Sequence, residues 1–369
     1  MTGRPASGSV DVIVGVHSDT RPIERVTASA LAAAATASVL VVAHNTDPAG
    51  IRARLGLLAD DPRVRIVPLA DGVRSPANAY NRGLDAARAE YVSIVGSDDE
   101  FAPGALDAWL ALARDADADV VIAPVVRSSG GIGTTPRPRP RRTRDLDGDR
   151  DRLFERSAPL GLVRRARFEG LRLTPGLPRG EDQAYSLHLW FSGARVAFDP
   201  RTPPYIEHDD QGDRVTRAAA PLAEDLAFLD AVEADPVFQR MSAVSRRAFA
   251  AKTLRVFVLD AIVARLCERG LDEATRAALA VVLPRIRSWA KHPTRLLSRR
   301  DRAILEAALA GAESVDRLRR LARRRGRTRS AAAIIPAAPW LILHRHAPLR
   351  SLLAHRRVVR AQREASGAP

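Results

Sequence analysis

Residues 10–126 alternate short apolar runs, rich in valine and isoleucine, with segments of helical spacing. The apolar runs are VDVIVGV (10–16), SVLVVA (38–43), RVRIV (63–67), YVSIV (91–95) and DVVIAPVV (119–126). Buried parallel strands have this length and this β-branched composition. The helical patterns between them cover residues 22–35, 51–59, 78–89 and 103–114. This alternation predicts an α/β fold in which a mostly parallel sheet is flanked by helices.

The strand pattern stops near residue 220, and the chain then changes character. Apolar residues recur at helical spacing over 222–233, 244–268, 272–283 and 301–323. The predicted regions are a flexible N-terminus at 1–9, an α/β domain at 10–219, a helical domain at 220–330 and a basic amphipathic tail at 331–369. Within the α/β domain, residues 127–151 are rich in glycine, proline and arginine and are predicted to form a flexible loop.

The tail mixes Trp340, isoleucine and leucine with arginine and histidine. Two interpretations stay open: contact with an anionic membrane surface, or packing against the body of the protein. No run reaches the ~18 to 20 apolar residues of a membrane span, and the N-terminal residues lack the apolar stretch of a secretory signal. Cys267 is the only cysteine, which suits a reducing compartment. We expect a cytoplasmic protein; on the first interpretation of the tail it also contacts the inner face of the cell membrane peripherally.

The formal net charge of +15 favours anionic partners such as phosphates, acidic lipids or acidic glycans. Of the 58 basic residues only Lys252 and Lys291 are lysines, and the arginines are spread along the whole chain. Aromatic residues make up 5% of the chain, and no zinc-binding, helix-turn-helix or RNP-type signature is present. The charge alone therefore predicts no specific nucleic-acid partner.

Ligands of such sheets bind beyond the carboxyl ends of the strands, in the loops after residues 16, 43, 67 and 95. The loop after residue 95 reads Gly96, Ser97, Asp98, Asp99, Glu100. Adjacent carboxylates at a strand end suit a hard divalent cation together with a diphosphate. The alternative is that Asp98 or Asp99 caps the helix that begins near Pro103.

Several segments resemble family 2 glycosyltransferases, over about residues 10–216. YNRGLDAARAEYVSIVGSDDEFAPGAL resembles the family core, in which an Asn-x-Gly helix leads into a strand that ends in the DxD metal motif. The opening VDVIVGVHSDTRPIERVTASALAA is similar to the first strand and helix, and PGLPRGEDQAYSLHLWFSG to the ED-containing segment with its helix at 182–192. PYIEHDDQGDRVTR resembles the stretch that carries a histidine. The residues that match the core motif are Asn81, Gly83, Tyr91, Asp98 and Asp99.

The resemblance implies a GT-A (Rossmann-like) fold and an inverting sugar transfer from a nucleotide-sugar donor. Asp182, which matches the ED aspartate, is then the general base, with Glu181 beside it. The alternative for Asp182 is a helix N-cap. Asp98 is the predicted ligand of Mn²⁺ or Mg²⁺, with His208 and Asp99 as further ligands.

The resemblance also implies a donor subsite over the first loops of the sheet, and a UDP-sugar is the donor that the family favours. The predicted donor-binding residues are His17, Asp19, Asn45, Asn78, Asn81, Ser97, Asp98 and Arg214. Two positions depart from the family pattern: Gly96 replaces the first aspartate of DxD, and Tyr80 replaces a frequent arginine. We expect weaker metal binding as a result.

The predicted function is transfer of a sugar to a hydroxyl of a cell-envelope glycan, a polyol-phosphate polymer or a lipid-linked acceptor. A nucleotidyltransferase-like enzyme is the second interpretation, although the HSDTRP segment lacks the glycine-rich, lysine-bearing loop of such enzymes. A catalytically degenerate glycan-binding protein of GT-A type is the third, suggested by Gly96.

Overall fold

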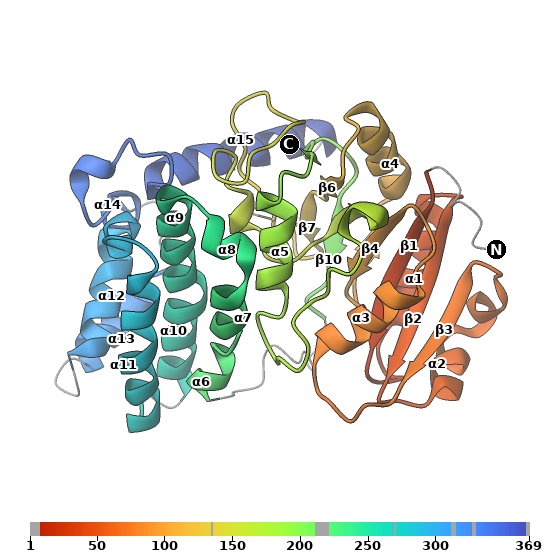
Figure 1. Cartoon of the computed structure of the whole chain (residues 1–369), viewed down its shortest axis with the longest axis horizontal. Coiled ribbons are helices and arrows are strands. Elements are labelled where there is room, and N and C mark those ends of the chain that lie inside the picture. Colours follow the sequence, from red (N-terminus) through yellow and green to blue (C-terminus); the bar gives the residue numbers. More distant parts are fainter. Residues whose placement is uncertain are drawn as a thin grey trace. The chain divides into compact units, whose positions relative to one another are not determined.

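The computed structural model describes residues 8–133, 136–210, 221–268, 271–310, 315–326 and 330–366 (Figure 1). The chain divides into two compact units, Met1–Ala218 with Val358–Pro369, and Ala219–Arg357. The division falls beside the boundary predicted between residues 219 and 220.

A seven-stranded sheet with the order β3-β2-β1-β4-β8-β6-β9 forms the centre of the first unit (Figure 1). Its strands are β1 (Val10–Val16), β2 (Ala37–His44), β3 (Val64–Leu69), β4 (Tyr91–Val95), β6 (Val120–Ile122), β8 (Gly161–Arg164) and β9 (Val196–Ala197). Strand β8 runs antiparallel to both of its neighbours, and the remaining pairs are parallel. The predicted mostly parallel α/β sheet is confirmed.

Helices cover both faces of this sheet because its strands are apolar on both faces. The longer elements are α1 (Ile23–Ala33), α2 (Pro48–Leu55), α3 (Pro76–Ala86), α4 (Ala105–Asp115) and α5 (Asp182–Phe191), with 3-10 turns η1 (Gly56–Asp60), η2 (Leu153–Glu155) and η3 (Arg165–Phe168). Val12 and Val14 of β1 join the apolar cluster that includes buried residues of α1 and α4. Ile13, between them, points the other way: a Cβ on Gly83 of α3 would lie 2.2 Å from its Cγ2. The glycine therefore lets α3 approach β1 closely.

The run at 119–126, predicted as one strand, is two strands in two different sheets. It divides into β6 and β7 (Val125–Arg127), which forms a small second sheet with β10 (Tyr205–Glu207) and β5 (Glu100–Phe101). Pro124 separates the two strands, and proline has no N–H to donate to a sheet ladder. The carbonyl of Pro124 instead accepts a hydrogen bond from Tyr205 N at 2.8 Å. The second sheet brings β10 beside the segment that follows β4.

The segment at 136–151, predicted as part of a flexible loop, is held in place by specific contacts. Asp151 is fully buried and pairs with Arg139 at 2.6 Å. Leu146 is also buried, and its N–H donates to Val196 O at 3.0 Å. The abundant arginines of this segment thus include an ion-pair partner for a buried carboxylate, which composition alone did not indicate.

The second unit is helical, as predicted. It contains α6 (Leu222–Asp225), α7 (Phe228–Ala234), α8 (Pro236–Arg240), α9 (Ala243–Thr253), the π-helix η5 (Leu254–Val258), α10 (Leu259–Glu268), α11 (Glu273–Ser288), η6 (Pro293–Leu296), α12 (Arg299–Leu309), α13 (Val315–Arg323), α14 (Ala331–Ile334) and η8 (Pro339–Leu341). Helix α15 (Pro348–Ser366) begins in the second unit and ends in the first. Across the described part of the chain, no helix combines the length and apolar character needed to cross a membrane.

Aromatic packing builds the core of the second unit. Phe238 lies against Trp289 with ring centroids 5.0 Å apart, and Phe249 stacks on Trp289 at 5.9 Å. Lys252 is 2% exposed and lies over the Phe249 and Phe257 rings, 5.3 and 5.0 Å from their centroids. These contacts account for a buried lysine without a catalytic role.

Candidate active site

The loop at 96–100, which follows β4 at the carboxyl edge of the sheet, is held by an arginine from the β1–α1 connection. Arg21 Nε donates to Ser97 Oγ at 3.0 Å, and Arg21 Nη2 pairs with Asp98 Oδ1 at 2.9 Å. The side chains of Arg21 and Asp98 are each 6% exposed. The negative charge of Asp98 is therefore balanced inside the protein by a buried guanidinium.

Asp99 accepts its hydrogen bonds from Tyr205 of β10 and from His208, the residue that follows β10. Its two carboxylate oxygens accept hydrogen bonds from the Tyr205 hydroxyl at 2.7 Å and from His208 N at 3.0 Å. The Tyr205 hydroxyl accepts in turn from Gly96 N at 2.9 Å. Burial raises the pKa of Asp99 to about 6. Asp99 thus ties the 96–100 loop to β10.

Gly96, which replaces the first aspartate of the family motif, faces these carboxylates. A Cβ at this position would lie 2.5 Å from Asp99 Oδ2 and 3.2 Å from Asp98 Oδ1. A side chain here would have to displace Asp99. A side chain at position 96 and the Asp99 carboxylate in its present position therefore cannot occupy this space together.

The predicted metal ligands each contact other groups of the protein. Asp98 pairs with Arg21, Asp99 accepts two hydrogen bonds, and His208 Nε2 lies 3.1 Å from Glu100 Oε2. Within the described ranges, no group of three or more His, Cys, Asp or Glu side chains is arranged to hold a metal ion.

The second acidic pair stands at the start of α5. Asp182 is the first residue of this helix, and Gln183 Nε2 donates to its Oδ1 at 2.7 Å. Burial, and then the adjacent Asp182 carboxylate, raise the pKa of Glu181 to about 8. Glu181 therefore keeps its proton at neutral pH.

Tyr80, on α3, connects the two acidic pairs. Its hydroxyl donates to Val95 O at 3.4 Å. Burial raises the pKa of Tyr80, and the charges of Glu181, Asp99 and Asp98 raise it further. Because Coulomb interactions weaken with distance, these effects indicate that Glu181, Asp98 and Asp99 lie near one phenol.

Arg156, which the sequence analysis did not select, is a buried cation of the same region. It is 7% exposed, its Nε donates to Ala158 O at 3.0 Å, and its Nη2 has no hydrogen-bond partner among the residues that the structure describes. Burial lowers the pKa of Arg156, while Glu207, Tyr205 and Asp182 act in the opposite direction. In a chain with so many arginines, no sequence signal distinguishes this one.

Two predicted donor-binding residues, Asn45 after β2 and Asn78 on α3, contact Asp71. The sequence analysis did not select Asp71. Asn78 Nδ2 donates to Asp71 Oδ2 at 2.7 Å, and His44 Nε2 lies 2.9 Å from Asp71 Oδ1. The hydrogen bond from Asn78 is the largest of several effects that hold the pKa of Asp71 well below its usual range. Asn45 Oδ1 accepts from the backbone N of Asp71 and of Gly72 at 3.0 and 2.9 Å. Asn45 and Asn78 thus shape the loop after β3.

The remaining predicted donor residues are dispersed. Both ends of the Asn81 amide bond the backbone of Leu173 at 2.9 Å, so Asn81 fastens α3 to the segment before Glu181 rather than facing an open subsite. His17 and Asp19 are exposed on the β1–α1 connection. Arg214 lies outside the described residues.

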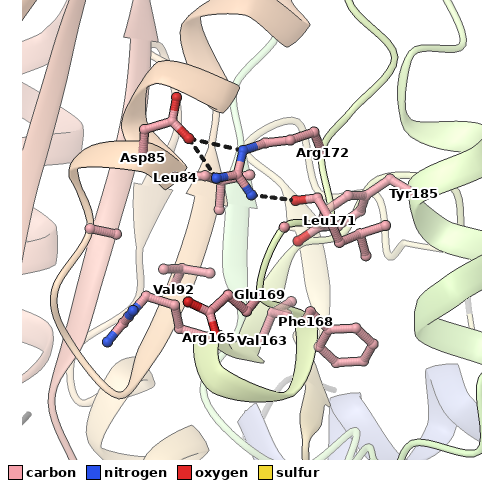
Figure 2. A pocket seen from close by; sticks show the side chains of 12 residues that line it. Leu84, Asp85, Val92, Val163, Arg165, Phe168, Glu169, Leu171, Arg172 and Tyr185 are labelled. Atoms are coloured by element: carbon pink, nitrogen blue, oxygen red, sulfur yellow. Dashed lines mark hydrogen bonds and ion pairs between the residues drawn. The ribbon is translucent and has the colours of Figure 1, made fainter.

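A separate pocket of about 210 Å³ contains none of the predicted site residues (Figure 2). It is lined by the end of α3, by β4 and β8, by η3 and the turn after it, and by Tyr185 of α5. Figure 2 shows Arg172 directed at Asp85, with Arg172 Nε donating to Asp85 Oδ1 at 3.0 Å, and Arg172 Nη1 donating to Leu171 O at 2.9 Å. The lining of this pocket mixes apolar and charged side chains and indicates no particular ligand.

The mostly parallel sheet, with Asp98 and Asp99 in the loop after β4, agrees with the GT-A fold that the sequence analysis expected. The family model described as Glycosyl transferase family 2 matches residues 11–171. Residues 11–171 are thus similar to glycosyl transferase family 2, in agreement with the resemblance described in the sequence analysis.

Two further comparisons agree with this assignment. The chain is 28% identical over 289 residues to the succinoglycan biosynthesis protein ExoO of Rhizobium meliloti (strain 1021), covering 73% of this chain and 81% of that protein. In fold it is similar to S. aureus TarS 1-349 in complex with UDP-GlcNAc, with a TM-score of 0.66, 16% identity, and 86% and 92% of the two chains covered. TarS 1-349 in complex with UDP matches with a TM-score of 0.60, 16% identity, and 87% and 92% of the two chains covered.

Proposed function

We propose that this protein transfers a sugar, with inversion, from a nucleoside diphosphate sugar to an acceptor hydroxyl, with Asp182 as the general base. The observations that support the proposal are the hydrogen bond from the Tyr80 hydroxyl to Val95 O, at the end of β4, and the effect of the Glu181, Asp98 and Asp99 charges on the same hydroxyl. Such a neighbourhood supplies a base close to the edge of the sheet at which ligands of α/β folds bind.

The reaction needs one proton acceptor and one leaving group. The acceptor hydroxyl gives its proton to the Asp182 carboxylate, and its oxygen forms a bond to the anomeric carbon. The bond between that carbon and the diphosphate oxygen breaks on the opposite face, and the nucleoside diphosphate leaves with the electron pair. Glu181, whose pKa is raised to about 8, is protonated at neutral pH and donates a hydrogen bond to an acceptor oxygen.

A UDP-sugar is the proposed donor because the similar TarS structures contain UDP-GlcNAc or UDP. The donor subsite would include His17, Asp19, Ser97 and Arg214, together with the loop that Asn45 and Asn78 shape. The acceptor is proposed to be a cell-envelope glycan, a polyol-phosphate polymer or a lipid-linked carrier. The similar ExoO is named for succinoglycan biosynthesis, which supports a glycan acceptor.

The test is the thermal stability of the purified protein with UDP, GDP, CDP or dTDP, since a ligand of the native state raises the melting temperature. At 100 times its Kd, one nucleotide stabilises the protein by about 2.7 kcal/mol. Hydrolysis or transfer of the matching UDP-sugar by the same sample would establish catalysis. Binding without any turnover would instead support a degenerate glycan-binding protein, the alternative suggested by Gly96.

Membrane contact through the tail is a further part of the proposal, at the cytoplasmic face of the cell membrane. Trp340 and Leu343 are 73% and 75% exposed. Six arginines follow between residues 345 and 363, and residues 331–363 contain no acidic residue. Exposed apolar side chains beside an uninterrupted positive charge suit an anionic bilayer.

Sedimentation with lipid vesicles tests this contact. Wild-type protein is expected to bind vesicles of phosphatidylglycerol and phosphatidylcholine, and to lose most of this binding at high salt. Replacing Trp340 and Leu343 by serine should weaken binding about tenfold or more, because both apolar anchors are removed. Leu57→Ser, at a residue 90% exposed in the first unit, is the matched control. Equal binding by the double variant and the wild type would contradict the proposed contact.

A further inference from the structure

We propose that one face of helix α13 (Val315–Arg323) binds the headgroups of anionic phospholipids. This inference rests on the membrane contact proposed for the tail, and it assigns the electrostatic part of that contact to a different element. Helix α13 lies in the second unit. Residues 317–329, which begin in this helix, contain eight arginines and no acidic residue. Such a block of like charge favours an anionic partner.

The arginines of α13 share one side of the helix. Leu318 is 1% exposed and Leu321 is half-buried, so this apolar side packs against the rest of the unit. The arginine face consists of four exposed side chains: Arg317, Arg319, Arg320 and Arg323. At 3.6 residues per turn these four cover an arc of about 160° centred opposite Leu318. The positive charge of α13 therefore points away from the core.

This arginine face has less internal compensation than exposed arginines at several other places in the chain. Those arginines form close ion pairs, such as Arg54–Glu24 at 2.7 Å, Arg201–Asp199 at 2.7 Å and Arg302–Glu306 at 2.6 Å. Among the residues that the structure describes, Asp316 is the one carboxylate paired with the arginine face, and it lies 3.7 Å from Arg319. Four neighbouring cations with one acidic partner repel each other, and an external anion relieves this repulsion.

The end of α13 and the start of the tail are fastened to the same end of α12. Arg300 Nη1, in the first turn of α12, donates to Arg324 O at 3.2 Å, directly after α13. In the tail, Ala337 N donates to Leu297 O at 2.7 Å, just before α12. Helices α13 and α14 both pack against α12 (Figure 1). Trp340 follows Ala337 by three residues, which span at most about 11 Å. The arginine face and the exposed tail side chains thus belong to one region of the second unit.

The apolar side chains of this region select a lipid surface over a soluble polyanion. Trp340 and Leu343 are 73% and 75% exposed. A soluble polyanion would neutralise the arginines but leave both apolar side chains in water. An anionic bilayer accepts both groups, because its phosphates meet the arginines and the boundary of its acyl chains takes the apolar side chains.

The experiment is sedimentation of the intact protein with phosphatidylcholine vesicles that contain or lack phosphatidylglycerol. The variant combines Arg317→Gln, Arg320→Gln and Arg323→Gln, because glutamine removes the charge and keeps a high helix propensity. Its binding to vesicles with phosphatidylglycerol should be about 10²-fold weaker than that of the wild type, since each arginine near an anionic surface contributes roughly a factor of five. Binding to phosphatidylcholine alone should stay within about threefold of wild type. A loss of less than about threefold with phosphatidylglycerol would overturn the proposal.

Two matched variants separate the arginine face from other effects of charge. Lysine at the same three positions keeps the charge and should bind within about threefold of wild type, because headgroup attraction depends on charge. A loss as large as that of the glutamine variant would contradict the electrostatic contact. The second variant replaces three exposed arginines of the first unit by glutamine, at Arg114, Arg142 and Arg150. It should bind like the wild type. An equal loss there would mean that net charge, and not α13, determines binding.

Two further measurements distinguish the occupants and the two parts of the contact. A glutamine variant that kept vesicle binding but lost binding to long-chain polyphosphate would assign the face to a soluble polyanion and overturn the proposal. If the Trp340 and Leu343 serine variant bound like the wild type while the α13 variant lost binding, the tail contact would be wrong and α13 would carry the binding. Wild-type protein that bound neither type of vesicle would contradict both. Nucleotide binding tests the proposed sugar transfer separately from all of these outcomes.

Discussion

The two pairs of adjacent acidic residues, Asp98 with Asp99 and Glu181 with Asp182, look alike in the sequence but have different surroundings in the folded protein. Asp98 and Asp99 are balanced by specific donors: a buried guanidinium, a phenol and a backbone N–H. Glu181 has another carboxylate as its nearest charge, and its pKa is raised to about 8. The first pair therefore organises the loop after β4, and the second pair includes one carboxyl, Glu181, whose pKa lies near neutral pH.

This difference shows that the motif alone does not set the role of a carboxylate. Donors from other elements decide whether its charge is balanced or remains available for chemistry. The partner of Ser97 lies 76 residues away, and the partner of Asp99 lies 106 residues away. Substitutions at Asp182, Glu181 and Tyr205 test this difference between the two pairs.

The largest effect is expected at Asp182. Asp182→Asn removes the proposed base but keeps the size of the side chain, so kcat should fall by about 10²- to 10⁴-fold. Nucleotide Kd, measured by calorimetry, should stay within about threefold of wild type. Asp107→Asn, at an exposed position of α4, is the control. A fully active Asp182→Asn enzyme would remove the distinction between the two pairs.

The next effect concerns pH and Glu181. The unfolded chain ionises this residue near its ordinary pKa of 4.5, whereas the folded protein keeps the proton up to about pH 8. The free energy of unfolding therefore falls as the pH rises through this window, by at most about 1.4 kcal/mol per pH unit. Glu181→Gln should lack this slope in urea denaturation series at pH 5 to 8.

Glu169→Gln provides the comparison, since Glu169 is exposed in the same unit. It should keep the wild-type slope. The pKa of Asp99 is also raised, from 3.8 to about 6. Ionisation of Asp99 therefore lowers the free energy of unfolding as the pH rises from 3.8 to about 6, in every variant. Identical slopes for Glu181→Gln and wild type above pH 6 would mean that Glu181 is ionised in the folded protein.

The smallest effect is expected at Tyr205, which supports the first pair. Tyr205→Phe removes the hydrogen bonds with Gly96 N and Asp99, and should lower the free energy of unfolding by about 1 to 3 kcal/mol. Tyr91→Phe, which loses only the bond to Ala118 O, should cost less. Urea denaturation measures both. If Tyr205→Phe were neutral, Asp99 would not depend on this phenol.

The order of elements and the family motifs were predictable from sequence because they depend on local patterns. The β1 run at 10–16 and the helix from 182 were predicted within a residue or two of their bounds. The strand at 119–126 was wrong because Pro124 sends β7 into a second sheet. The ion pair between Arg139 and the buried Asp151, inside the loop predicted at 127–151, was not predictable from composition.

The α/β architecture, the family resemblance and the two acidic pairs were predictable from the sequence alone, since apolar periodicity and residue spacing are local properties. Only the tertiary structure decided that Arg21 pairs with Asp98, that Asn81 bonds Leu173, and that Arg156 is buried within range of the charge of Asp182. These contacts join residues from different elements, and their strength depends on burial. The physical reason is that Coulomb energy and desolvation are set by distance and environment in three dimensions, which no local pattern of residues contains.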